Sequence, residues 1–245
     1  MLQVLLLFGV GTIAGFVNVM AGGGSSLTVP ALIFLGLDGA TANGTNRIAI
    51  LVQNVFAITG FQQNKRNEFA ESFKLALLTL PGAIIGALVA VSIQDVWFKR
   101  ILSVVILFVI ISMFLPRPSG QNTDSRQNKI ALYLGLFGAG FYGGFIQIGV
   151  GFILMAVLFH LAKFDLLRVN VYKVFIIFLY TLPALAVFIF SGKINWLWGL
   201  VLSAGNGLGG WLGAHLASKR GESVIRIVLI CVLLLMGAKL LLTTL

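Results

Sequence analysis

Long apolar segments alternate with short polar ones along this chain of 245 residues. Runs close to the ~20 residues that a helix needs to cross a bilayer lie at 2–21, 46–63, 73–93, 98–115, 130–148, 170–190, 196–217 and 223–243. Composition agrees with this pattern, because 59% of the residues are hydrophobic, 10% are charged and the mean hydropathy is +1.04. The sequence therefore predicts an all-α polytopic membrane protein with about eight long spans.

Two glycine-containing segments interrupt the apolar pattern, GGGSS at 22–26 and GVG at 149–151. Residues 2–36 are too many for one ordinary span at ~1.5 Å per residue, so the chain either crosses only once over this length or reverses at the first interruption and returns as a short helix over 27–35. Backbone that leaves the helical form at membrane depth is tolerated only inside protein or beside a cavity. The interruptions therefore indicate two short broken or re-entrant helices and a site beside them.

The second half of the chain repeats the first at an offset of 127 residues. The shift pairs Gly22 with Gly149, Gly24 with Gly151, Asp38 with Asp165 and Asn43 with Asn170. A polar segment rich in Pro, Gly and Asn, 116–129, lies between the halves and cannot continue a membrane helix. We expect two repeats of about five helical elements each, at 1–115 and 130–245, joined by the linker 116–129.

The basic residues predict how the chain is oriented. Formal net charge is +10, but Lys and Arg cluster in short loops between apolar runs, which argues against nucleic acid as a partner. A single crossing over 2–36 would divide Lys and Arg almost evenly between the two faces, whereas reversal at both interruptions places twelve on one face and four on the other, which favours the reversal. The first face is then cytoplasmic, with the central linker, and both termini lie outside. An odd number of elements in each half also makes the repeats inverted, as in many secondary transporters.

The first interruption has the chemistry of an anion site. Backbone N–H groups at the start of a helix, together with serine hydroxyls, carry the positive end of the helix dipole. Polar groups within the spans are further candidates, because such groups in a membrane are commonly functional. The predicted substrate-binding residues are Gly22, Gly23, Gly24, Ser25, Ser26, Asn18, Asn43, Asn46, Arg47, Gln147, Gly149, Gly151, Asn170, Tyr172 and Lys173.

Each group of candidates also has a purely structural interpretation. Asn43 and Asn170 can serve as helix caps, and Arg47 and Lys173 can be snorkelling side chains at the bilayer interface. Asp38 and Asp165 fit loops or caps better than proton carriers. Close packing of helices is the preferred interpretation for residues that recur every four positions on one face, namely Gly82, Gly86, Gly205, Gly209, Gly213 and Ala217.

The segments 15–49, GFVNVMAGGGSSLTVPALIFLGLDGATANGTNRIA, and 140–173, GFYGGFIQIGVGFILMAVLFHLAKFDLLRVNVYK, resemble the two repeat signatures of the sulfite exporter TauE/SafE family. The resemblance extends over essentially the whole chain. The second segment departs from the pattern, with Val150 at a glycine position and Val157 where the first has Pro30. The resemblance implies a bacterial plasma-membrane permease for small sulfur-containing anions such as sulfite, thiosulfate or organosulfonates, commonly exporting them.

Other function classes have weaker support in the sequence. His160 and His215 lack a Cys or carboxylate at ligand spacing, so no metal or cofactor is predicted. The alternatives are an intramembrane enzyme, a membrane scaffold protein, or a permease that takes anions up; the oligomeric state is open. All seven carboxylates fall in loops or at helix ends, which favours a uniporter driven by the membrane potential over one coupled to a proton relay.

Overall fold

The computed structural model describes residues 1–63, 69–114 and 128–220, and within these ranges the chain forms nine helices and no strands. The helices are α1 (Leu2–Ala21), α2 (Ser25–Phe34), α3 (Gly39–Gln63), α4 (Phe69–Ser92), α5 (Asp95–Phe114), α6 (Lys129–Phe145), α7 (Val150–His160), α8 (Leu166–Phe190) and α9 (Trp196–Arg220). The last predicted span, 223–243, and most of the linker lie outside the described residues. The expectation of an all-α protein is confirmed for the described part.

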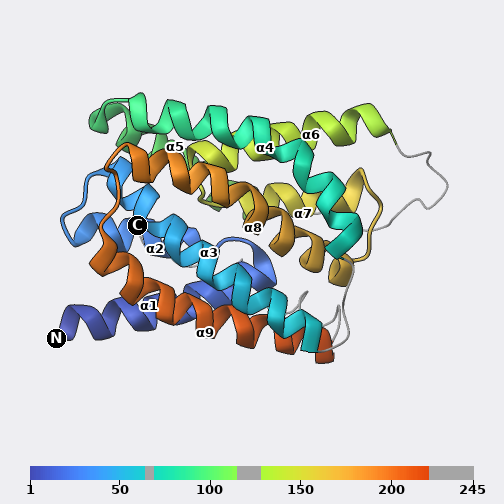
Figure 1. Ribbon diagram of the computed structural model, residues 1–245, viewed down its shortest axis with the longest axis horizontal. Coiled ribbons are helices and arrows are strands. Elements are labelled where there is room, and N and C mark those ends of the chain that lie inside the picture. The colour runs from blue at the N-terminus through green and yellow to red at the C-terminus, as the bar shows by residue number, and fades with distance from the viewer. Residues whose placement is uncertain (64–68, 115–127, 221–245) are drawn as a thin grey trace.

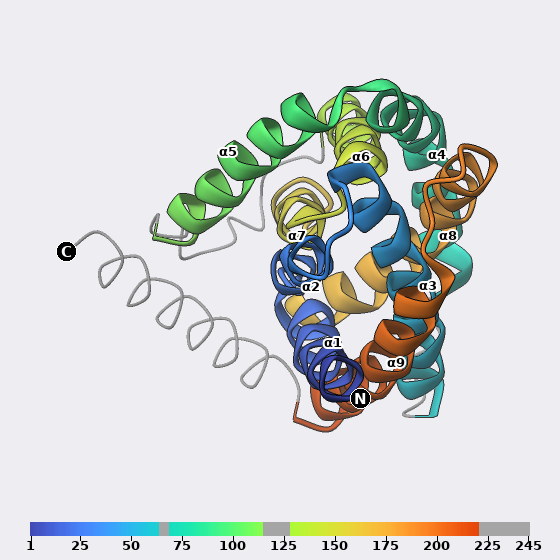
Figure 2. The same ribbon diagram turned by 90° about the vertical axis from the view of Figure 1, so that its left-hand side faces the viewer.

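The long helices lie along one axis of the molecule (Figure 1). Helices α1, α3 and α9 run in one direction along it, and α4, α6 and α8 run in the other. Neighbours pack in the order α1, α9, α3, α8, α4, α6, and the short helices α2 and α7 lie between the two ends of this arc, α1 and α6 (Figure 2). Helix α5 projects away from the arc and contacts it mainly through α3.

The chain reverses at two places near the middle of the long axis (Figure 1). Helix α1 ends at Ala21 and is followed by Gly22 in the left-handed conformation, with φ 90°. Helix α7 is preceded by Gly149, also left-handed with φ 73°. Side chains disfavour this conformation, so glycine is the residue that allows both turns. The predicted reversals are confirmed, but the second turn is formed by 146–149, because Gly151 already belongs to α7.

Every long helix except α1 differs from its predicted bounds; α4 begins at Phe69 rather than 73, α5 begins at Asp95 rather than 98, and α9 ends at Arg220 rather than 217. Helix α3 begins at Gly39 rather than 46, α8 begins at Leu166 rather than 170, and α6 ends at Phe145 rather than 148. Polar residues near the starts of α3 and α8 are buried against protein rather than lipid. These helices therefore extend beyond the apolar runs that were used to predict them. The short helix α2 likewise begins two residues before the predicted 27 and ends at Phe34.

Helix bounds follow the sequence repeat. Adding 127 to the bounds of α3, 39–63, gives the bounds of α8, 166–190. The same shift carries the first residue of α4, 69, onto that of α9, 196. Helix pairing follows it as well, since α1 packs parallel to α9 and α4 packs parallel to α6.

Glycines lie at the contacts of the two parallel helix pairs, α1 with α9 and α4 with α6. A methyl group at Gly209 would lie 2.8 Å from the Phe16 nitrogen of α1, and one at Gly86 would lie 2.7 Å from the Phe145 nitrogen of α6. Gly82 and Gly205 approach the facing backbones in the same way. The predicted packing role of these glycines is therefore confirmed, and it brings helices from opposite halves of the chain into backbone contact.

Among the described helices, three are long and apolar enough to cross a membrane: α1, residues 71–92 of α4, and α8. Helices α3 and α9 are 25 residues each, but polar residues and glycines lower their hydropathy. Part of this polarity is fully buried, with Asn46 in α3 and Asn206 in α9 both inaccessible to solvent. The arc therefore presents apolar side chains outward and encloses polar ones.

Candidate functional site

The two chain reversals touch each other. A Cβ atom at Gly22 would lie 2.5 Å from the Gly151 carbonyl carbon, and one at Gly151 would lie 2.6 Å from the Gly22 oxygen. Gly24 lies equally close to α1, where an added Cβ would be 2.6 Å from the Asn18 Cβ. Gly23 faces only the tip of the Phe152 ring. Backbone from the two halves thus meets at the centre of the protein, at positions where side chains do not fit.

Arg47 of α3 is completely buried and extends to the end of α6. Its Nη1 donates to the Gly143 carbonyl at 3.0 Å and to Gln147 Oε1 at 3.1 Å, and Nη2 donates to the Gly144 carbonyl. The guanidinium also lies over the ring of Phe188, 4.6 Å from its centroid. Burial excludes the predicted alternative of a snorkelling side chain for Arg47.

The last carbonyls of α6 are all satisfied, although a helix leaves them without intrahelical partners. The Ile146 N–H donates to the Tyr142 carbonyl, and Arg47 donates to the Gly143 and Gly144 carbonyls. Asn43 Nδ2 donates to the Phe145 carbonyl at 2.8 Å. Asn43 therefore caps a helix, as one interpretation predicted, but at the C-terminus of a helix from the other half rather than at the start of its own.

Lys173 of α8 occupies the corresponding place at the end of α1. Its Nζ donates to the Val19 carbonyl at 2.7 Å, to the Asn18 carbonyl at 3.3 Å and to Asn170 Oδ1 at 2.7 Å. The side chain is fully buried, so Lys173 is not a snorkelling residue either. Each half of the chain thus places one cation at the C-terminus of the broken helix of the other half, where the helix dipole favours positive charge.

The polar residues that begin α2 bond mainly within the first half. Thr28 donates to Asn46 Oδ1 at 2.6 Å, and Asn46 Nδ2 donates to the buried Ser25 hydroxyl at 3.4 Å. The Ser26 hydroxyl turns back to the Gly23 carbonyl at 2.7 Å. Of the two predicted serines, only Ser25 therefore faces the polar interior.

A row of amides leads inward from α1 to α3. Asn18 Nδ2 donates to Gln53 Oε1 at 3.2 Å, and Gln53 Nε2 donates to Asn54 Oδ1 at 3.5 Å. In the other half, Gln147 Nε2 donates to the Tyr180 hydroxyl at 3.2 Å. Gln53 and Tyr180 are related by the 127-residue shift, so equivalent positions of α3 and α8 receive the polar groups of the breaks.

Tyr172 lies in a different cluster from the other candidates. Its hydroxyl donates to Glu71 Oε2 at 2.5 Å, and Arg168 binds the same carboxylate and stacks over the ring of Phe164. Glu71 lies in the first turn of α4, Arg168 and Tyr172 lie in the first two turns of α8, and Phe164 precedes α8. The structure therefore brings fourteen of the fifteen predicted residues to the two breaks and their neighbouring turns, and separates Tyr172 from them.

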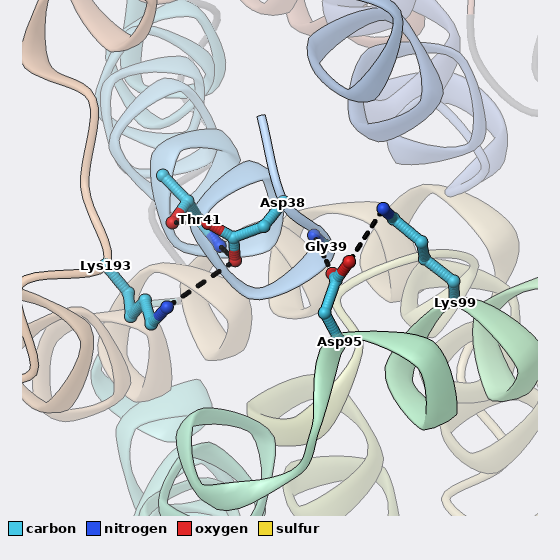
Figure 3. Close-up of polar contacts among 6 residues, drawn as sticks. All are labelled: Asp38, Gly39, Thr41, Asp95, Lys99 and Lys193. Atoms are coloured by element: carbon cyan, nitrogen blue, oxygen red, sulfur yellow. Dashed lines mark hydrogen bonds and ion pairs between the residues drawn. The ribbon is translucent and has the colours of Figure 1, made fainter. Parts of the chain in front are cut away.

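The opposite end of the bundle holds a second polar cluster, at the start of α3 (Figure 3). Asp38 accepts the Thr41 N–H and hydroxyl and lies 3.7 Å from Lys193 Nζ, while Asp95 accepts the Gly39 N–H at 2.7 Å and pairs with Lys99. Asp165 caps α8 in a similar way by accepting two N–H groups. The capping interpretation of Asp38 and Asp165 is confirmed.

Both carboxylates of the cluster have a pKa below the ordinary value. Burial acts to raise the pKa of Asp38, but the hydrogen bonds from Thr41, aided by Lys193, outweigh it. The hydrogen bond with Lys99 is the main cause that lowers the pKa of Asp95. Both carboxylates are therefore ionised at neutral pH and act as structural anions at the helix ends.

No Asp or Glu is buried among the described residues, so Arg47 and Lys173 have no carboxylate beside them there. Several buried donors near them also lack an acceptor within that part of the chain, namely Arg47 Nε, Asn54 Nδ2 and Asn170 Nδ2. Buried polar atoms are nearly always satisfied, so unpaired ones indicate a missing partner. The unpaired amide acceptors are fewer, namely Asn43 Oδ1 and Asn206 Oδ1, so donors and positive charge predominate in this interior, which suits an anion.

Sequence reasoning missed two contributors to this interior. Asn206 is fully buried in α9 with both amide atoms unpaired among the described residues. It lies in the stretch GNGLGG, for which we predicted a packing role alone. An amide side chain within an apolar helix could have indicated that Asn206 belongs to the polar interior. Thr28 carried no such signal, because threonine is common in membrane helices.

Comparison with known proteins agrees with this geometry. Residues 7–240 match the profile of the family described as Sulfite exporter TauE/SafE. The chain belongs to the TauE/SafE family. This is a family of transporters, not of enzymes, and the chain is a multi-pass membrane protein.

Relatives of this TauE/SafE chain extend over nearly its full length. A probable membrane transporter protein of Haemophilus influenzae is 31% identical over 96% of this chain and 92% of its own length. The probable membrane transporter proteins YfcA of Escherichia coli and YunE of Bacillus subtilis are 28% and 26% identical, each over 96% of this chain and over 88% and 96% of their own lengths. No solved structure matches.

Proposed function

We propose that this chain transports small sulfur-containing anions, such as sulfite, thiosulfate or organosulfonates, out of the bacterial cytoplasm across the inner membrane. The family description supports the substrate class, since it names a sulfite exporter. Export is the direction that an interior-negative membrane potential favours for an anion, by ~2.3 kcal/mol per charge per 100 mV. The substrate site is the contact of the two reversals together with the buried polar residues around it.

The observation that carries the proposal is the pair of buried cations without buried carboxylates. Arg47 and Lys173 are both completely inaccessible, and the described interior holds no Asp or Glu. An unpaired buried ion costs several kcal/mol even after its surroundings relax. Hydrogen bonds to helix carbonyls offset part of this cost, and a bound anion would offset more. Substrate binding thus stabilises an arrangement that is otherwise strained electrostatically.

An inverted repeat supports alternating access around this site. The 127-residue shift superposes the bounds of α3 and α8, and α1 runs opposite to its counterpart α6 along the long axis (Figure 1). In such folds two halves of opposite orientation rock around a fixed central site. The cross-half bonds of Arg47 and Lys173 are contacts that this rocking would rearrange.

The charge distribution supports an orientation with the central linker in the cytoplasm and both termini outside. Because Arg47 and Lys173 are buried, they do not count as loop charges, and the basic residues then divide eleven to three between the two faces. The end with more charge holds the C-terminal end of α9, with Lys219 and Arg220, and the first residue of α6, Lys129 (Figure 1). This excess is the bias expected of a cytoplasmic face.

Flux into and out of liposomes tests the proposed function. Purified protein is reconstituted without proton or sodium gradients, and tracer sulfite, thiosulfate and an organosulfonate are followed while valinomycin imposes a potassium potential. We expect flux of at least one of these anions toward the positive side. The change Arg47→Gln should reduce it by about tenfold or more, since it removes a buried charge, whereas Lys129→Gln at an exposed helix start should not. Absence of flux for the whole panel in the folded protein would refute the proposal.

A further inference from the structure

The charges at the breaks define how much negative charge the site can hold. At each break the C-terminus of one helix lies a few residues from the N-terminus of the next, at α1 and α2 and again at α6 and α7. The macrodipole contributions of ~0.5 charge at these ends are opposite in sign and offset each other. The side chains of Arg47 and Lys173 therefore determine the net charge of the centre.

Both side chains are charged in this arrangement. An arginine keeps its proton in proteins. Lys173 Nζ faces three oxygen acceptors, the Asn18 and Val19 carbonyls and Asn170 Oδ1. A lysine ammonium has three donors and no acceptor, whereas a neutral amine would turn its lone pair toward one of these oxygens. The three acceptors favour the ammonium form, in which the centre carries two positive charges.

Each cation also has an unpaired donor beside it. Arg47 Nε has no acceptor among the described residues. Asn170 uses its Oδ1 to accept from Lys173, which fixes the orientation of the amide and leaves Nδ2 as a buried donor without an acceptor in the described chain. An anion at the centre can therefore find a charge and a free N–H group from each half.

The carbonyls at both breaks are already occupied by these cations. Broken helices in other inverted-repeat transporters use such carbonyls to hold a coupling ion. Here Lys173 binds the Asn18 and Val19 carbonyls, and Arg47 binds those of Gly143 and Gly144. The chain supplies, through covalently attached side chains, the positive charge that a sodium ion would bring.

We propose that Arg47 and Lys173 act as two built-in counter-cations, which make the site selective for a doubly charged anion and remove the need for a co-transported cation. This inference rests on the proposed function and narrows its substrate class to dianions such as thiosulfate, excluding singly charged organosulfonates. A monoanion leaves one buried charge without compensation, and a coupled cation would add a third.

Thiosulfate and methanesulfonate form a matched pair of probes, because a terminal sulfur in one replaces a methyl group of similar size in the other, while the charge changes from two to one. In proteoliposomes with the intact protein, we expect initial thiosulfate flux to exceed methanesulfonate flux by at least about tenfold. Lys173→Gln should bring the two rates within about threefold of each other, and the exposed Lys129→Gln should preserve the wild-type ratio.

The accumulation ratio measures the charge moved and needs no variant. At a potassium potential of ~60 mV, uniport of a dianion accumulates it ~100-fold, whereas movement of one net charge gives ~10-fold. We expect ~100-fold for thiosulfate, unchanged when sodium is replaced by choline. Equal fluxes of the two probes, or accumulation near 10-fold, would overturn this inference while leaving anion transport intact. A protein that moves neither probe nor sulfite would instead overturn the proposed function.

Discussion

A single substitution tests whether transport requires the close backbone contact between the two reversals. Replacing Gly151 with alanine puts a methyl group 2.6 Å from the Gly22 oxygen. Ordinary contacts of a Cβ begin near 3.4 Å and the Gly22 Cα lies nearer still, so the two backbones would have to separate by more than about 0.8 Å. Overpacking of this kind costs about 1–3 kcal/mol. Since 1.4 kcal/mol corresponds to a factor of ten, we expect anion flux to fall by about 10-fold to 100-fold.

The control is Gly138→Ala in α6, where an added Cβ meets nothing within 4 Å. Alanine favours the helical state over glycine by about 1 kcal/mol, so this variant should be as stable as the wild type or more so, with unchanged flux. Both proteins are compared by tracer flux in liposomes and by the fraction that elutes as a monodisperse species. Wild-type flux in Gly151→Ala would show that the reversals need not touch, and the reasoning from their contact would be wrong.

Three further predictions concern other parts of the chain. A cysteine introduced at position 121 of the linker should resist an impermeant thiol reagent in intact cells, and labelling from outside would reverse the proposed orientation. The pKa of Asp38 is lower in the folded than in the unfolded chain, so its contribution to stability is complete above the unfolded pKa and is lost as pH falls through the folded pKa. Asp38→Ala should therefore lower the free energy of unfolding by about 1 kcal/mol at neutral pH, because the cap is lost. It should also reduce the fall of the melting temperature with decreasing pH. Tyr172→Phe should keep flux within about twofold, since its hydroxyl binds Glu71 outside the central cluster; a loss of flux would restore Tyr172 to the substrate site.

The reversals could be predicted from sequence because glycine is used where other residues are strained. The triplet at 22–24 and the pair at 149 and 151 stand out in apolar surroundings, and the left-handed Gly22 and Gly149 are the reason for them. Helix ends were less predictable where polar residues are buried. Helix α3 starts seven residues before its apolar run, because the bundle rather than the lipid surrounds its first turns.

The roles of the two buried cations could not be predicted from sequence. Arg47 bonds residues almost one hundred positions away, and Lys173 bonds residues more than 150 positions away, so no local pattern announces either contact. A lysine or arginine near the end of an apolar run usually reaches the interface, which made that the reasonable expectation. Their location depends instead on which helix of the other half ends beside them, and this is a property of the assembled fold.

Direct localisation of a bound anion tests whether the substrate site lies between the two reversals. Selenosulfate differs from thiosulfate only by selenium in place of the terminal sulfur, so anomalous diffraction at the selenium edge can locate it in crystals of the intact protein. We expect one peak beside the Gly22 and Gly151 contact, within reach of Arg47 or Lys173. A peak at the end clusters of Arg168 or Lys193 instead, with the centre empty, would contradict it.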